Sequence, residues 1–333
     1  TELRTTSSSV SSISYSSMSS VSSSTMVEFP SSASSSFSRE YEEGSFMALA
    51  GINGYYAISP DYGNTWTKKS FMQDDARPNL IMSSSAKHQT VAAWDPTGSS
   101  FEIWVSNSGG GNWSKKHIET NLNTLGGLST LAEGSCSSDG RHQMFSFRDN
   151  SDLNVVNSSD FGATWERTVI AETGNPRMIL SMAMMSKDGK NRIVGPANKY
   201  FYKSTNYGNS WSLLSPSGLT SDYYYASNGS SYLNVLAMVG ESGDIFISRD
   251  FGNSWIKRLD TSVYLRSDWR QIGMSENGQY IAYIAAAFSS TGWMIRISRD
   301  YGVSWTEGPF LSTGSYASYG GGISISKSGK YML

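Results

Sequence analysis

Three arginines stand at comparable points of the sequence, and the chemistry they suggest is anion binding. Arg77 lies in "DDARPN", Arg177 in "GNPRMI" and Arg270 in "SDWRQI", each just before an apolar run that we expect to form a strand. A guanidinium donates two parallel hydrogen bonds to a carboxylate, so three of them around one mouth would form an anion site. The simpler interpretation, which we prefer, is that they are loop arginines paired with nearby aspartates: Asp74, Asp75 or Asp268.

Two aromatic groups with adjacent aspartates could instead hold a sugar ring. Asp222, Tyr223 and Tyr224 belong to "DYYY", and Asp268 precedes Trp269 in an equivalent position of the next unit. Flat aromatic faces suit the apolar face of a sugar, and a carboxylate accepts hydrogen bonds from its hydroxyls. The alternative is that these rings pack between neighbouring units, which is at least as good an interpretation for Tyr224 and Trp269.

Other kinds of site lack support in the sequence. The histidines His88, His117 and His142 are scattered without metal-ligand spacing, so we predict no metal and no cofactor. A formal net charge of −2 gives no sign of a nucleic-acid partner. No apolar run approaches the ~20 residues that a membrane-spanning helix needs. We therefore expect no nucleic acid among the partners and no membrane span.

The elements that must position these candidates are announced by an eight-residue segment that occurs six times. Four copies follow the pattern S-x-D-x-G-x-[ST]-W, while Asn206 replaces the aspartate in the fourth copy and Ser108 replaces it in the second. Successive tryptophans lie 44 to 52 residues apart. The other residues that mark the six copies are Asp61 and Trp66, Trp113, Asp160 and Trp165, Trp211, Asp250 and Trp255, and Asp300 and Trp305.

The composition of the segment indicates a turn with an apolar anchor. Short Ser and Asp side chains accept hydrogen bonds from nearby backbone N–H groups, and Gly adopts positive φ without strain. The tryptophan is a large apolar plate that is best buried against a neighbouring unit. Because a catalyst needs one acid in one place, six equivalent segments argue against a catalytic role for the aspartate.

Around each copy the sequence alternates in the manner of β-strands. Apolar runs at 234–240 and 280–286 are each followed by an alternating segment, at 244–248 and 294–298, and Ser/Gly turns separate the units. Four short strands in each unit of about 45 residues is the spacing of propeller blades. We predict an all-β, six-bladed propeller of four-stranded antiparallel blades over residues 41–333.

We expect the ends of the chain to close this ring. The tail "GKYM" at 329–332 aligns with "GSFM" at 44–47, so the tail would supply the inner strand of the first blade. Sharing a blade in this way removes an open sheet edge. In the alternative interpretation, residues 320–333 open a seventh blade or a second propeller, because the sequence resembles a piece of a longer precursor.

The repeated segment resembles the Asp-box, also called the bacterial neuraminidase (BNR) repeat, of the sialidase-like superfamily. The resemblance covers roughly residues 44–333, and it implies a propeller whose boxes lie on the rim, away from any active site. Sialidases also carry a Phe/Tyr-Arg-Ile-Pro motif, a Tyr–Glu nucleophile pair and an Asp acid/base. That motif is absent here, since the nearest stretch is "FSREYE" at 37–42.

The first 40 residues have a composition unlike the rest of the chain. Residues 7–38 contain 19 serines and almost no charge, which is too little apolar surface to fold alone. We expect a disordered or extended arm, and Ile13 and Tyr15, which alternate with serines, would let it add to a neighbouring subunit as a strand. Three N-glycosylation sequons favour a secreted or surface protein: Asn112, Asn157 and Asn228.

These observations favour a non-catalytic extracellular binding or structural module, glycosylated and part of a larger surface or filamentous assembly, with carbohydrate or neighbouring subunits as partners. Two alternatives stay open. The first is a sialidase-like glycoside hydrolase that uses the three arginines as an anion clamp. The second, implied by the resemblance, is an assembly factor like the Asp-box propellers that serve photosystem assembly. Fold alone does not choose between them.

Overall fold

The computed structural model describes most of the chain after its N-terminal arm. The arm, residues 1–40, lies outside the described residues, and so do several loops. The described ranges are 45–51, 54–72, 77–95, 99–122, 133–149, 152–172, 180–196, 200–220, 224–240, 244–259, 265–287, 292–308, 311–312 and 323–332. No described residue belongs to a helix that could span a membrane.

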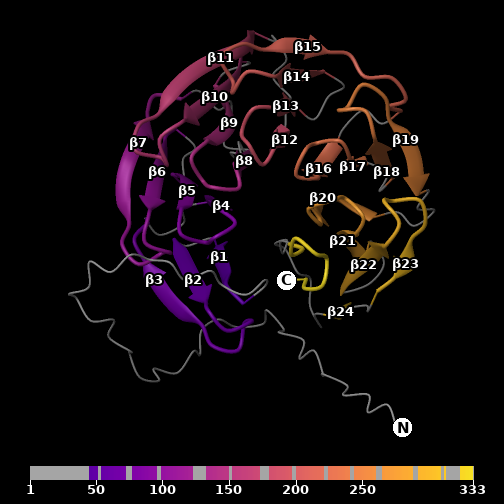
Figure 1. Ribbon diagram of the computed structural model, residues 1–333, viewed down its shortest axis with the longest axis horizontal. Coiled ribbons are helices and arrows are strands. Elements are labelled where there is room, and N and C mark those ends of the chain that lie inside the picture. Colours follow the sequence, from indigo (N-terminus) through magenta and orange to yellow (C-terminus); the bar gives the residue numbers. More distant parts are fainter. Residues whose placement is uncertain are drawn as a thin grey trace.

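Six antiparallel sheets stand around a central axis, as Figure 1 shows, so the prediction of an all-β, six-bladed propeller is confirmed. No helix occurs among the described residues. Blade 1 comprises β1 (Met47–Gly51), β2 (Tyr55–Ser59) and β3 (Thr67–Ser70). Blade 2 comprises β4 (Arg77–Met82), β5 (Gln89–Trp94), β6 (Phe101–Ser106) and β7 (Ser114–Glu119). Blade 3 comprises β8 (Glu133–Cys136), β9 (Gln143–Asp149), β10 (Asp152–Ser158) and β11 (Glu166–Glu172).

The other three blades continue in the same order. Blade 4 comprises β12 (Leu180–Met185), β13 (Arg192–Pro196), β14 (Phe201–Ser204) and β15 (Ser212–Leu214). Blade 5 comprises β16 (Tyr224–Gly229), β17 (Leu236–Gly240), β18 (Ile245–Ser248) and β19 (Ile256–Leu259). Blade 6 comprises β20 (Leu265–Met274), β21 (Ile281–Ala287), β22 (Gly292–Ser298) and β23 (Thr306–Glu307), and β24 (Leu311–Ser312) also pairs with β22.

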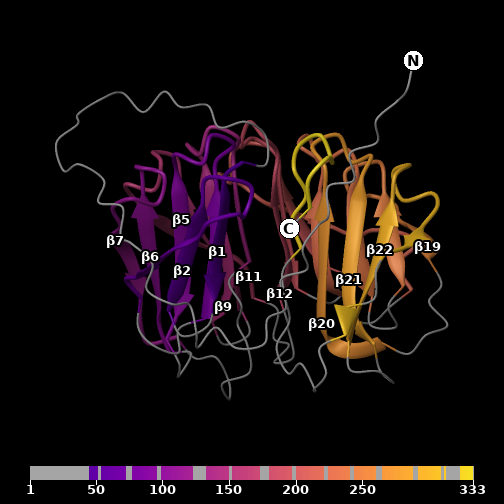
Figure 2. The same ribbon diagram turned by 90° about the horizontal axis from the view of Figure 1, so that it is seen from below.

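The two faces of the disc carry different connections. In blades 2 to 6, the turn from first to second strand and the box from third to fourth strand lie at one end of the blade, which we call the repeated face. In blade 1 the box joins β2 to β3 at the same end. The remaining connections lie at the opposite end, which we call the variable face. They differ in length, since β7 ends at Glu119 and β8 begins at Glu133, whereas β19 ends at Leu259 and β20 begins at Leu265. In Figure 2 the blades stand side by side with their strands running between these two faces.

On the repeated face, six similar turns lie near the axis. Five of them join the first and second strands of blades 2 to 6, and the sixth follows blade 6. In each turn the serine N–H donates to the carbonyl five residues later, at 2.8–2.9 Å. The serine hydroxyl accepts a hydrogen bond from the N–H of that later residue, as in His88 to Ser83 at 3.1 Å. The six turns are Ser83–His88, Ser137–His142, Ser186–Asn191, Ser230–Val235, Ser275–Tyr280 and Ser326–Tyr331.

A relay of backbone hydrogen bonds links these turns from blade to blade. In every step the N–H that follows one turn serine donates to the carbonyl at the same position of the next turn. The donors and acceptors are Ser84 to Ser138 (2.8 Å), Ser138 to Lys187 (2.7 Å), Lys187 to Ser231 (2.6 Å), Ser231 to Glu276 (2.8 Å) and Glu276 to Lys327 (2.9 Å). The relay therefore fixes the spacing of successive blades around the axis.

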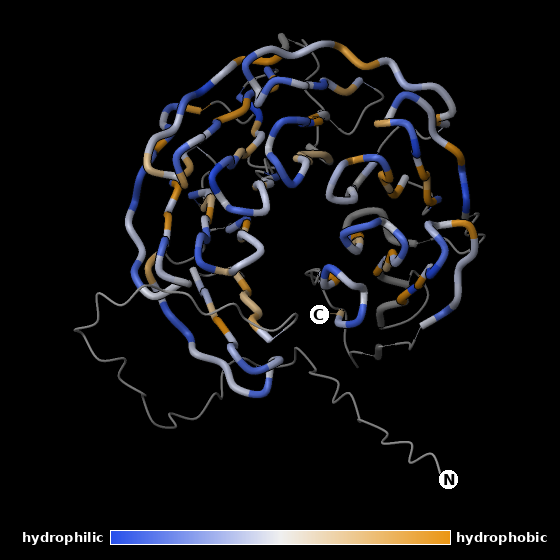
Figure 3. Tube along the Cα trace, viewed as in Figure 1, coloured by the Kyte–Doolittle hydropathy of each residue, from blue (hydrophilic) through white to orange (hydrophobic). Residues whose placement is uncertain are grey.

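The hydrophobic core is divided among the blades and the contacts between them. One cluster joins Ile103 and Val105 of blade 2 to Phe145 and Val155 of blade 3, and each of these side chains is buried. In Figure 3 the outermost strands β3 and β7 are largely hydrophilic, which agrees with a core that lies inward of them. Each blade is therefore stabilised chiefly by its two neighbours, as in other repeat proteins.

The C-terminal segment occupies a different position from the one expected of a shared strand. The sheet of blade 1 has three strands, and residues 323–332 form no ladder with β1 among the described residues. They form the last inner turn, held by a bridge between Ile325 and Met332. In blade 6, the second-strand residue Ile281 lies opposite both the first-strand residue Met274 and the box serine Ser298. Met332 lies opposite Ile325 and Met47 lies opposite the box serine Ser59, so both hold the repeat position of Ile281. Two residues cannot fill one position, so the tail is not the inner strand of blade 1.

Candidate functional site

The repeated aspartates are the first candidates, and the box geometry commits them to the turn. In blade 5, the Asp250 carboxylate accepts hydrogen bonds from the Ser248 hydroxyl (2.8 Å), the Ser254 N–H (2.9 Å) and the Ser254 hydroxyl (2.5 Å). The Gly252 N–H donates to the Ser248 hydroxyl at 2.9 Å. The boxes of Asp61, Asp160 and Asp300 repeat this set of bonds.

These hydrogen bonds stabilise the ionised form of each carboxylate. The Ser304 hydroxyl and the Ser304 N–H lower the pKa of Asp300 to about 2. Around Asp250, burial acts to raise the pKa, but the hydrogen bonds from Ser254 outweigh it and the pKa is lowered. A carboxylate with a lowered pKa stays ionised at neutral pH and is therefore a poor proton donor there. The box aspartates are therefore structural.

Each box contains two successive residues with positive φ, of which the sequence indicated only the glycine. Phe251 (φ 60°) precedes Gly252 (φ 80°), and an aromatic residue holds the first position in five of the boxes. The second box has Gly109 there instead. A bulky residue is strained in this region. The strain is accompanied by contacts between blades, as between the rings of Phe161 and His88 at 4.6 Å.

The two divergent boxes keep the fold of the turn with different atoms. Asn206 accepts from the Ser210 N–H through Oδ1 (3.0 Å) and donates through Nδ2 to the Ser210 hydroxyl (2.9 Å). In the second box the Ser108 hydroxyl accepts from the Asn112 N–H at 2.9 Å. Elsewhere the indole N–H donates to the box glycine carbonyl, whereas Trp211 Nε1 has no partner among the described residues.

The three predicted arginines are only partly placed. Arg77 begins β4 and Arg270 lies within β20, so both are on the innermost strands of their blades. Arg177 lies outside the described residues, as do the side chains of the other two. The anion clamp therefore stays a prediction.

The predicted aromatic group is also divided. Asp222 and Tyr223 lie outside the described residues, and so do the side chains of Asp268 and Trp269 in β20. Tyr224 begins β16 and is fully buried, and its ring lies 5.5 Å from that of Phe246 in an edge-on contact. Its face is therefore used in packing, as the alternative interpretation describes.

The three sequons differ in accessibility. Asn112 is exposed in the second box. Asn157 lies in β10 and accepts a hydrogen bond from the buried Arg192. Asn228 lies in β16, where its amide donates to the Ile272 carbonyl at 3.1 Å, because the first strand of blade 5 extends up to the turn serine. Asn112 is the sequon whose side chain is most available.

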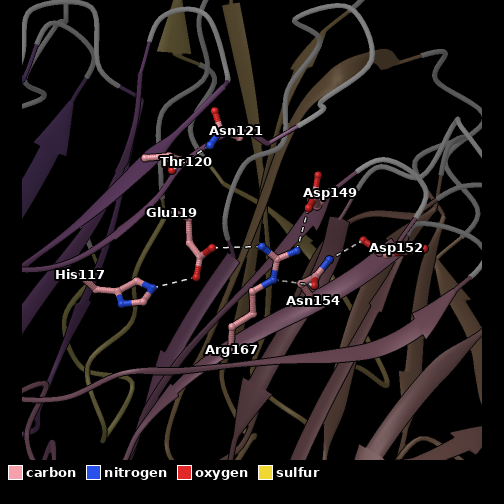
Figure 4. Close-up of polar contacts among 8 residues, drawn as sticks. All are labelled: His117, Glu119, Thr120, Asn121, Asp149, Asp152, Asn154 and Arg167. Carbon is pink, nitrogen blue, oxygen red and sulfur yellow. Dashed lines mark hydrogen bonds and ion pairs between the residues drawn. The ribbon is translucent and has the colours of Figure 1, made fainter.

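An ion-pair network that the sequence did not reveal joins the outer parts of blades 2 and 3 (Figure 4). Arg167 on β11 contacts Glu119 (3.1 Å) and Asp149 (2.7 Å), and His117 contacts Glu119 at 2.8 Å. The Asn154 amide oxygen accepts a further bond from Arg167 Nε at 3.0 Å. Burial acts to raise the pKa of Glu119, but its hydrogen bonds with His117 and Arg167 lower it. The network fastens two blades together.

Glu133 is the acidic residue whose environment best suits proton transfer. It begins β8, the innermost strand of blade 3, at the variable face, and it is half-buried. Burial raises the pKa of Glu133 to about 7. Its carboxyl has no hydrogen-bond partner among the described residues. Sequence reasoning missed it because nothing in "LAEGSC" marks a buried acid. In the described part of the chain, no group of three or more His, Cys, Asp or Glu residues could hold a metal.

Comparison with solved structures shows the fold of this chain. It is similar to the β-propeller domain of Cps50 (Swd1) from Myceliophteria thermophila, with a TM-score of 0.57 and 13% identity over 84% of this chain and 86% of that one. YCF48 from Cyanidioschyzon merolae gives a TM-score of 0.54 and 14% identity over 80% and 82% of the two chains. A structure of YCF48 bound to D1 peptide gives 0.52 and 13% over 83% and 80%.

At these identities the likeness concerns the propeller fold alone. No protein-family model matches the sequence, and no curated protein matches it. The chain is therefore a β-propeller that is similar in fold to these solved propellers.

Proposed function

We propose that this protein is a non-catalytic extracellular binding or structural module, and that it binds its partner on the variable face. The observation that carries the proposal is the use of all four box aspartates in turn hydrogen bonds. The acids that recur are scaffold, so the differences between blades must supply recognition. Those differences are concentrated in the connections of the variable face, and loops held by a rigid scaffold are common binding elements.

Carbohydrate and protein are both suitable partners for such a face. The residues Asp222 and Tyr223, which directly precede β16 in the sequence, have the types that bind sugars. The solved YCF48 propeller bound to D1 peptide supports a peptide partner, and with it a role in assembly. The exposed sequon Asn112 and the scarcity of charged residues support a location outside the cell.

Binding without turnover is the expected result of a direct test. The full chain is applied to an array of sialylated and neutral glycans, and hydrolysis of fluorogenic glycosides is followed in parallel. We expect retention on the array that falls at least about tenfold in Tyr223→Ala and is unchanged in Tyr232→Ala, an exposed tyrosine of the repeated face. Retention that falls equally in both variants would place binding elsewhere.

Glycoside hydrolysis is a second candidate function, which Glu133 favours. An acid with a pKa of about 7 at the inner end of a blade is half-protonated at neutral pH and can donate a proton to a leaving group. Hydrolysis of a fluorogenic sialoside that Arg270→Ala and Glu133→Gln both abolish would replace the first proposal with this one. Absence of turnover by the wild-type chain would remove it.

A further inference from the structure

The last inner turn lies one blade place beyond blade 6. The relay continues from Glu276 of blade 6 to the Lys327 carbonyl, in the same way that it passes between the other blades. A side chain added at Gly329 would meet Tyr280 of blade 6. Lys327 therefore stands to blade 6 as Glu276 stands to blade 5. No further step of the relay from Lys327 is found among the described residues.

The same turn also lies one place before blade 1. Between blades 2 and 3, the ring at the end of an inner turn packs on the box aromatic of the next blade, with His88 and Phe161 4.6 Å apart. His142 packs on Tyr207 of the next blade in the same way, at 4.9 Å. The ring of Tyr331 lies 5.4 Å from that of Tyr62 in the first box. Residues 323–332 thus occupy a seventh place, between blades 6 and 1.

Blade 6 shows that the outer part of this place is not filled by described residues. The side chain three positions before each box serine points toward the following blade. It is fully buried in the first five blades, at Tyr56, Ile103, Val155, Phe201 and Ile245. The equivalent Ile295 is only half-buried, and so is Ile297 beside it. Among the described residues, no segment covers this apolar surface of blade 6 as the next blade does elsewhere.

On the other side of this place, the described residues of blade 1 are also less covered than their equivalents in other blades. The box glycine normally approaches the third strand of the preceding blade, and a side chain added at Gly162 would meet Val105 of blade 2. The atoms nearest to one added at Gly63 belong to Met47 and Trp66 of its own blade. The β1 strand is half-buried along most of its length, whereas β5 and β17 are buried throughout.

We propose that this seventh place, which we call the seam, binds the serine-rich segment 7–38 of the same chain as added β-strands. The proposal is independent of the proposed function. The segment precedes Ser45, whose carbonyl accepts from the N–H of Tyr62 at the edge of the seam at 2.9 Å. A tether of this length holds the segment at a high effective concentration beside the surface it would cover.

The chemistry of the segment fits the surface. A strand in this place needs apolar residues at alternate positions and little charge, because it lies between two blades. The turn segment already there begins Ile323-Ser-Ile-Ser, and the arm contains the similar alternation Ile13-Ser-Tyr15. It also contains the apolar residues Met26, Val27 and Phe29 on either side of Glu28. Small serines between apolar residues allow close approach of neighbouring sheets. An edge that would otherwise be open is then paired, which propellers require for solubility.

Photo-crosslinking from the seam tests the proposal in the full chain. Tyr62→p-benzoylphenylalanine places the reactive group at the seam, and Tyr207→p-benzoylphenylalanine is the matched control, because both tyrosines are exposed box aromatics (39% and 42%). The chains are mixed with isotope-labelled copies and then irradiated. The mixture is digested, and the linked peptides are identified by mass spectrometry. We expect links from position 62 to residues 7–38 of the same copy, at least about fivefold more abundant than from position 207.

Three outcomes overturn the proposal. Links from position 62 to the segment of a labelled copy would make the occupant a second chain. Equal yields from both positions would show no preference for the seam. Hydrogen exchange of residues 7–38 at the rate of an unstructured peptide would show that no strand forms. Loss of the links in Ile13→Ser with Tyr15→Ser, but not in Ser12→Ala with Ser14→Ala, would support the alternation as the basis of binding.

Discussion

The interface between blades 5 and 6 and the seam between blades 6 and 1 are built from the same repeat but are covered differently. Ile245 of blade 5 is fully buried in a cluster with Ile272 and Ile281 of blade 6. Ile295, which holds the same place in blade 6, is half-buried. A repeat therefore specifies the strands and turns of a blade, whereas the burial of its side chains depends on which segment stands next to it.

The largest expected effect comes from the tryptophan of a covered box. Trp255 is nearly buried (3% exposed) and packs near Phe201 of blade 4. We expect Trp255→Ala to lower the free energy of unfolding by about 3–5 kcal/mol, as aromatic deletions from cores do. Trp66→Ala, in the box at the seam, should cost about half as much. Urea unfolding followed by circular dichroism measures both, and equal losses would contradict the contrast between the two regions.

A second pair of substitutions isolates the interface itself. Ile245→Ala should lower the free energy of unfolding by about 2–5 kcal/mol, because it opens a cavity in a closed core. In a chain that also carries Ile13→Ser and Tyr15→Ser, we expect Ile295→Ala to cost at most about 1 kcal/mol, since the Ile295 side chain is only half-buried. If Ile295→Ala costs more in a chain whose arm is unaltered, the difference measures how much the arm stabilises this site. Thermal unfolding is compared for the wild type, Ile245→Ala, Ile295→Ala, the arm variant, and the arm variant with Ile295→Ala.

The smallest expected effect concerns a box carboxylate. Asp250→Asn should cost about 0.5–1 kcal/mol at neutral pH, because a neutral amide replaces a charged acceptor. The pKa of Asp250 is lowered in the folded state, so its stabilisation is complete above the usual pKa and is lost as the pH falls through the lowered value. Melting temperatures of wild type and variant should therefore converge as the pH falls below the ordinary pKa of an aspartate. Asn206→Asp should introduce the same dependence in blade 4.

Much of the architecture was predictable because it depends on local patterns. The spacing of the six tryptophans gave the blades, and the tolerance of Asn206 and Ser108 at the aspartate position indicated a turn. The hydrogen bonds at Asp250 are made within the box itself, so residue types and spacing were sufficient to infer a structural aspartate.

The remaining features depend on contacts between blades, which local patterns do not encode. The sequence left two alternatives open for residues 323–332, a shared strand of blade 1 or the start of a seventh blade, because an inner turn has the same sequence wherever it stands in the ring. The positive φ of Phe251 was missed because aromatic residues rarely adopt it without an external contact. The raised pKa of Glu133 comes from burial in the folded blade, which the local sequence does not show. Arg167 and its partner Glu119 lie in different blades, so no spacing in the sequence pointed to their contact.

The relay of inner turns has a direction, and this has a consequence for biosynthesis. In each step an earlier blade provides the N–H and a later blade provides the carbonyl, from Ser84 through Glu276. While the chain emerges from the ribosome, the relay N–H of each new turn stays unpaired until the next turn along the chain has been synthesised. Blades would then dock in order from the N-terminus, each maturing only after the next is synthesised. A pause in translation after any blade would hold a defined, partly satisfied intermediate with one exposed flank.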